Sequence, residues 1–192
     1  MSPAVGRETA GARLRGVLVI ACGNTLRGDD GAGPETGELL AAELEGTGAE
    51  VIVVDQLLPE LALDASRSAR VVFVDAAADL PPGSVSVRPV NPGKDAPGDG
   101  GAESPNSASR VPGAARRSLD PFSHGIGPED VLRLARDLYA AEPDAVLVSV
   151  GAESFEPGDG LSATVRRAIP AAVRAAVRAA EEGAGTASRD DA

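Results

Sequence analysis

Short apolar runs alternate with amphipathic segments along the whole chain. Each run is rich in Val, Ile and Leu and has the length of a buried strand, and the fourth alternates apolar and polar residues as an edge strand does. The five predicted strands are Val17–Ala21, Val51–Val54, Val71–Val74, Val85–Val90 and Ala145–Val150.

The segments between these runs have features of helices. Leu39, Leu40 and Leu44 lie near one face of the first, and Pro59 stands at the first helical position of the second. We expect a kink or a break at Pro170 in the last. The four predicted helices are Gly33–Gly46, Pro59–Ala69, Pro128–Glu142 and Leu161–Glu182.

Alternation of strands and helices predicts one α/β domain with a mostly parallel, five-stranded sheet. We place this domain at residues 15–182 and expect disorder at 1–14 and 183–192. Residues 91–118 are rich in Gly, Pro, Ser and Asp, with almost no large apolar residue, which predicts a long mobile loop.

Composition restricts the functions that need considering. The 192-residue chain has a net charge of −11, which argues against nucleic-acid binding because that requires a basic face. A single Cys excludes an intramolecular disulfide framework. No apolar run reaches the roughly 18–20 residues of a membrane span, and the N-terminus lacks the apolar region of a signal peptide. We therefore expect a soluble cytoplasmic protein that acts without a membrane.

Candidate chemistry gathers where the strands end. Asp29 and Asp30 follow the first strand in a glycine-rich turn, Gln56 follows the second, and Asp75 closes the third. Ligands of parallel α/β sheets bind outside the carboxyl ends of the strands. These residues are therefore expected at the ligand-binding edge of the sheet.

The turn that contains Asp29 and Asp30 has three interpretations. Its glycines match neither common phosphate-binding motif, and two carboxylates would repel a phosphate. An aspartate at a strand-to-helix turn is commonly a helix cap. The third interpretation is a metal site, in which Asp30 and Asp75 are joined by His124 from the segment FSHGIG. One imidazole and two carboxylates suit a divalent first-row ion and leave positions open for water or substrate.

Other chemistry involving the single histidine has less support. A Cys22–His124 nucleophilic pair is conceivable, but a buried Cys is commonly inert. Ser123 beside His124 does not form a triad by adjacency alone. A histidine with a purely structural or exposed role also remains open at this point.

Four motifs occur in the order typical of one family: GNTLRGDDGAG, VVFVDAA, FSHGIGPEDVLRLA and VGAESFEPGDGLSATVRRAIP. Over about residues 16–177 the sequence resembles the hydrogenase maturation proteases. This resemblance implies a twisted, mostly parallel sheet with helices on both faces. It also implies an endopeptidase that removes the C-terminal extension of a [NiFe] hydrogenase large-subunit precursor after nickel insertion.

The resemblance also assigns roles to residues. It implies that Asp30, Asp75 and His124 are the catalytic and metal-contacting residues, although Asp29 competes with Asp30 for its position. It implies that nickel is supplied by the precursor and bound only transiently. We expect a monomer whose partner is the precursor. A non-catalytic nickel- or precursor-binding chaperone is the alternative, and a small-molecule hydrolase or nucleotide binder is a third hypothesis.

Overall fold

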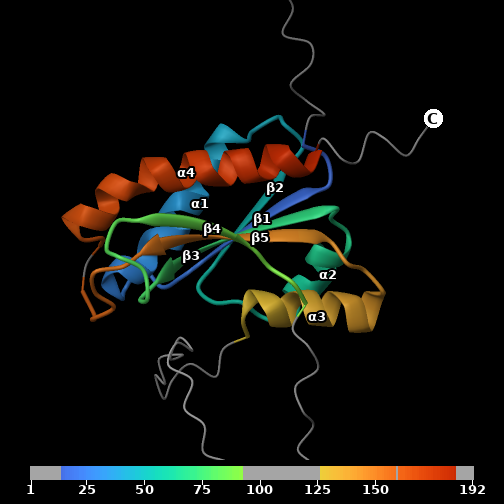
Figure 1. The fold of residues 1–192 in the computed structure, drawn as a ribbon, viewed down its shortest axis with the longest axis horizontal. Coiled ribbons are helices and arrows are strands. Elements are labelled where there is room, and N and C mark those ends of the chain that lie inside the picture. The colour runs from blue at the N-terminus through green and yellow to red at the C-terminus, as the bar shows by residue number, and fades with distance from the viewer. Residues whose placement is uncertain (1–13, 93–125, 159, 185–192) are drawn as a thin grey trace, which may run out of the picture.

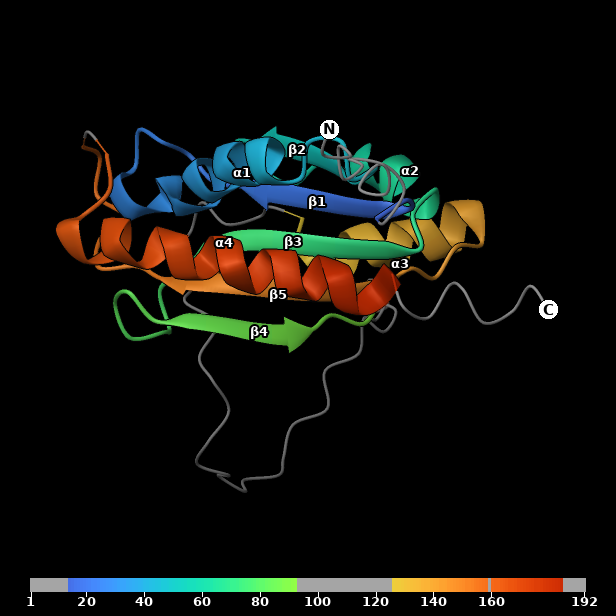
Figure 2. The same ribbon diagram turned by 90° about the horizontal axis from the view of Figure 1, so that it is seen from above.

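A computed structural model describes residues 14–92, 126–158 and 160–184 of the chain. Its sheet has the strand order β2-β1-β3-β5-β4 (Figure 2). All neighbouring pairs are parallel except β4 and β5, which are antiparallel. The predicted mostly parallel five-stranded α/β fold and the edge position of the fourth strand are thus confirmed. The strands are β1 (Val17–Cys22), β2 (Glu50–Val54), β3 (Arg70–Ala77), β4 (Val85–Pro89) and β5 (Asp144–Gly151).

Helices cover both faces of this sheet. Figure 1 shows α1 (Ala32–Glu43) and α4 (Ala163–Ala184) above it, and α2 (Leu61–Ser66) and α3 (Pro128–Tyr139) below it. A short 3-10 helix, η2 (Gly28–Gly31), leads into α1. The helices are therefore arranged as the family resemblance implies.

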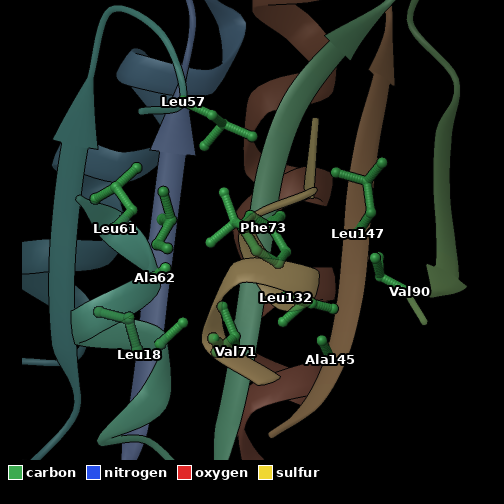
Figure 3. Packing of buried hydrophobic residues seen from close by; sticks show 14 of the residues in the cluster. Leu18, Leu57, Leu61, Ala62, Val71, Phe73, Val90, Leu132, Ala145 and Leu147 are labelled. Carbon is green, nitrogen blue, oxygen red and sulfur yellow. The ribbon is translucent and has the colours of Figure 1, made fainter. Parts of the chain in front are cut away.

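The period-two alternation of each strand divides the core between the two faces. Leu18, Val71 and Phe73 are fully buried under α2 and α3 (Figure 3). Val19 and Val72, one position along their strands, are fully buried under α1 and α4. The central strands are apolar on both faces because both faces are covered.

Three local expectations differ from the structure. Leu39 is 48% exposed, whereas Leu40 and Leu44 are buried. Helix α2 begins at Leu61, so Pro59 is not its first residue. Helix α4 runs through Pro170 without the expected break, while a kink there stays a prediction. Buried residues on both sides of Pro170 explain the continuity, because they hold both halves of the helix against the same face of the sheet; they include Val165, Ile169, Ala172 and Ala176.

The ends of the described chain lie close to the predicted domain boundaries. Leu14 is fully buried in the core under α1 and α4, and α4 ends at Ala184. Residues 1–13 and 185–192 lie outside the described residues, and so do residues 93–118 of the predicted loop. Their disorder stays a prediction.

Glycines bring α1 unusually close to the sheet. A Cβ atom on Gly37 would lie 2.6 Å from the Ala21 Cβ and 2.8 Å from a Val53 methyl group. We expect Gly37→Ala to lower the free energy of unfolding by about 1–3 kcal/mol, because overpacking outweighs the helix propensity gained. Urea denaturation measures this. Glu38→Ala, an exposed substitution in the same helix, serves as the control and should change it by less than about 0.5 kcal/mol. A stabilised Gly37→Ala protein would contradict the close packing.

Candidate functional site

The topology of the sheet places a switch point between the carboxyl ends of β1 and β3. After β1 the chain crosses to β2 on one side, and β3 then pairs with β1 on the other side. Strand order reverses between these two strands, and α/β proteins bind ligands at such switch points. The β1–α1 turn and Asp75 of β3 both lie at this switch point.

Gly23, in the turn after β1, packs directly against the backbone of Asp30. Gly23 has φ of +143°, and a Cβ atom there would lie 2.0 Å from the backbone oxygen of Asp30. The Asn24 backbone N–H donates to Asp30 Oδ2 at 3.0 Å, and Asn24 Oδ1 accepts from the Leu26 N–H at 2.9 Å. This hydrogen bonding fixes the position of the Asp30 carboxylate.

The same turn offers little to a phosphate. Three of its N–H groups are already used: Arg27 donates to the Asn24 carbonyl, Asp29 to that of Ser154, and Asp30 to that of Arg27. A phosphate-binding loop instead presents free N–H groups to its ligand. The geometry therefore argues against the phosphate-loop interpretation.

The Asp29 side chain joins the turn to the loop between β5 and α4. It is 1% exposed, and its carboxylate accepts the backbone N–H groups of Glu153, Ser154 and Ser162 at 2.8, 3.2 and 2.6 Å. Burial alone raises the pKa of Asp29, but hydrogen bonds from Ser162, Glu153 and Ser154 outweigh it and hold the pKa below its usual range. Asp29 is therefore a structural carboxylate that connects two loops distant in sequence.

Asp75 lies on β3 and faces the side of the sheet covered by α2 and α3. Its Oδ1 accepts the Ala76 N–H at 2.8 Å. Burial raises the pKa of Asp75 and the nearby Asp30 charge adds to this, whereas the hydrogen bonds from Ala76 and the Cys22 thiol lower it; the net result is a pKa of about 7. Asp30 and Asp75 therefore interact electrostatically, and Asp75 can gain or lose a proton near neutral pH.

Cys22 ends β1 beside Asp75 and is 5% exposed. Burial, followed by the charge of Asp75, raises the pKa of its thiol. A nucleophilic cysteine needs the opposite shift, toward the thiolate. The structure therefore disfavours the Cys22–His124 nucleophile and makes this thiol a neutral neighbour of Asp75.

Two of the three predicted metal-contacting residues lie among the described residues. Asp30 and Asp75 lie near enough at the switch point to interact electrostatically, Asp29 is held by the β5–α4 loop instead, and His124 lies outside the described residues. Within the described residues, no group of three or more His, Cys, Asp and Glu side chains is arranged to hold a metal ion. The two carboxylates can supply two hard oxygen ligands to a metal ion. Alternatively, one of them can accept a proton while the charge of the other raises the pKa of that acceptor.

Sequence reasoning missed Ser149, which the sheet places opposite Asp75 in the β3–β5 register. The available signal was a single hydroxyl residue in the otherwise apolar run AVLVSV. A polar residue inside a buried strand, close to its carboxyl end, is a reason to examine the site.

Solved structures share this fold. The [NiFe] hydrogenase maturation protease HybD from Thermococcus kodakarensis is 23% identical with a TM-score of 0.57, and the match covers 85% of this chain and 98% of that one. The hydrogenase maturating endopeptidase HybD from E. coli is 23% identical with a TM-score of 0.58, and the match covers 86% of this chain and 92% of that one. An endopeptidase from Escherichia coli is 23% identical with a TM-score of 0.63, and the match again covers 86% of this chain and 92% of that one.

These matches support the resemblance drawn from the sequence motifs at the level of the fold. The chain has the α/β architecture of hydrogenase maturation proteases over most of its length. No family model and no curated protein matches the sequence. Among the described residues, no helix is both long enough and apolar enough to cross a membrane.

Proposed function

We propose that this protein is an endopeptidase of hydrogenase maturation, which removes the C-terminal extension of a [NiFe] hydrogenase large-subunit precursor after nickel insertion. The observation that carries the proposal is the interaction of Asp30 with Asp75 at the switch point of the sheet. The fold shared with solved maturation proteases supports it. We infer that the protein acts as a cytoplasmic monomer.

Nickel enters this proposal as part of the substrate. The carboxylates of Asp30 and Asp75 and the imidazole of His124 would hold it, and ligands from the precursor would complete its coordination. Carboxylate and imidazole ligands both suit divalent first-row ions. Ile126, the first described residue after His124 in the chain, packs against the core under α2 and α3, which is the side of the sheet that Asp75 faces.

Hydrolysis adds water across the scissile peptide bond: the carbonyl carbon gains a hydroxyl group and the leaving nitrogen gains a proton. A carboxylate of this site can accept a proton from water as general base. Bound nickel supplies recognition of the loaded precursor and electrophilic polarisation. Burial raises the pKa of Asp75, the charge of Asp30 adds to this effect, and Asp30 is itself fixed by the Asn24 N–H.

The test is the intact mass of a large-subunit precursor, with and without nickel, after incubation with this protein. We expect loss of a C-terminal peptide from the nickel-loaded precursor only. A stable complex with no change in mass would instead identify a chaperone. Equal cleavage of both precursors would contradict the nickel requirement while leaving the endopeptidase. Binding to nucleotide, with no binding to any precursor, would contradict the proposal as a whole.

A further inference from the structure

A groove of about 340 Å³ lies beside Asp75. Side chains of β3, β4 and β5 line it together with the first residues of the β3–β4 connection. Its volume falls in the lower part of the range of ligand pockets, about 300–1,000 Å³. The groove therefore gives Asp75 an adjoining binding surface.

Strand register aligns three polar residues in this groove. Asp75 pairs with Ser149 in the parallel β3–β5 ladder, and Ser149 pairs with Ser86 in the antiparallel β4–β5 ladder. Directly paired residues point to the same face, and neighbouring strands lie about 4.8 Å apart. The hydroxyl groups of Ser149 and Ser86 therefore follow Asp75 in a row across the sheet.

Ser149 is the least exposed polar residue of this row. It is 9% exposed and lines the groove, yet its hydroxyl makes no hydrogen bond to any residue that the structure describes. No described side-chain atom is both sealed from solvent and unsatisfied, so this hydroxyl is reached through the groove. A nearly buried polar group without a partner calls for an explanation, and a bound ligand is one.

Charge indicates what class of ligand fits. Arg88 lines the groove, but its guanidinium is paired with Glu129 at 2.9 Å. Asp75 and Asp79 also line it and disfavour an anion. The remaining donors are two neutral hydroxyl groups, which suit the carbonyl oxygens of an uncharged polypeptide backbone.

We propose that this groove binds the stretch of substrate polypeptide adjoining the scissile bond, and that the Ser149 hydroxyl donates a hydrogen bond to one of its carbonyl oxygens. The identity of this polypeptide rests on the proposed function. Ser149 is then a substrate-positioning residue, and Ser86 forms the far end of the same subsite.

Steady-state cleavage of the nickel-loaded precursor tests Ser149→Ala. We expect KM to rise about 3–10-fold with kcat unchanged within twofold, as for one lost hydrogen bond. Ser149→Thr keeps the hydroxyl and should restore KM. The matched control is Ser68→Ala, whose hydroxyl donates to the Asp64 carbonyl outside the groove and should leave both constants unchanged. Thermal denaturation of Ser149→Ala should match the wild type, because the hydroxyl has no partner within the described chain.

Binding of a synthetic peptide spanning the processing junction, followed by calorimetry, separates this inference from the proposed function. Weaker binding to Ser149→Ala than to the wild type and Ser68→Ala supports the groove even if the wild type cleaves no precursor. Cleavage by the wild type with unchanged constants in Ser149→Ala overturns the groove and leaves the function. A wild type that neither binds the peptide nor cleaves the precursor overturns both.

Discussion

Substitution of two adjacent aspartates is expected to give opposite results. Asp29→Ala should lower the free energy of unfolding by about 3 kcal/mol or more, because it leaves the backbone N–H groups of Glu153, Ser154 and Ser162 without their acceptor. Asp30→Asn should leave the fold intact, because an amide oxygen can still accept the Asn24 N–H. Cleavage by this variant should nevertheless fall at least about 100-fold, since it lacks the carboxylate of a proposed ligand.

Urea denaturation and precursor cleavage, measured on both variants, separate the two roles. The contribution of Asp29 to stability also has a defined pH window: it is present above the pKa of the unfolded carboxyl group and is lost as pH falls through the lower pKa of the folded one. Asp29→Ala should therefore differ least from the wild type in strong acid. A stable, inactive Asp29→Ala protein together with an active Asp30→Asn protein would reverse the assignment.

The sequence could predict the sheet but not the different roles of Asp29 and Asp30 in the β1–α1 turn. Strand positions follow from apolar runs, and the parallel sheet follows from their alternation with helices. The direction of each aspartate depends on the turn geometry at Gly23 and on Ser162, which lies more than a hundred residues away in the chain. No local pattern contains that information. The part of His124 in the site stays a prediction.

The wrong prediction that Leu39 lies on the buried face of its helix has a related cause. Hydropathy weights leucine heavily and glycine little, whereas α1 contacts the sheet through Gly33 and Gly37. A Cβ atom on Gly33 would lie 1.9 Å from the Cys22 carbonyl oxygen. Because small residues let the helix approach the sheet, the helix face is set by Gly33, Gly37 and Leu40, and Leu39 is turned toward solvent. Sequence patterns that count only large apolar residues miss such a face.

Asp75→Asn is expected to abolish cleavage and to stabilise the protein at alkaline pH. Burial raises the pKa of Asp75 to about 7 in the folded protein, above the ordinary value of 3.8 that we take for the unfolded chain. Between these values the folded state keeps a proton that the unfolded state has lost, so this group makes stability fall as pH rises from about 4 to 7. Asparagine carries no charge, so Asp75→Asn does not lose stability in this way as the pH rises. Asp75 is only partly buried, so we expect a gain of about 2 kcal/mol at pH 8.

The measurement is urea denaturation of the wild type and Asp75→Asn at pH 5 and pH 8. The difference in stability between the two proteins at pH 5 should be about a third of the difference at pH 8. Asp79→Asn, an exposed substitution four residues along the chain, should change stability by less than about 0.5 kcal/mol at both values. A site that keeps a carboxylate at a cost in stability is under a functional requirement, because asparagine would satisfy the fold. If Asp75→Asn were no more stable than the wild type at pH 8, burial would not raise the pKa of Asp75 as inferred here from its place in the fold.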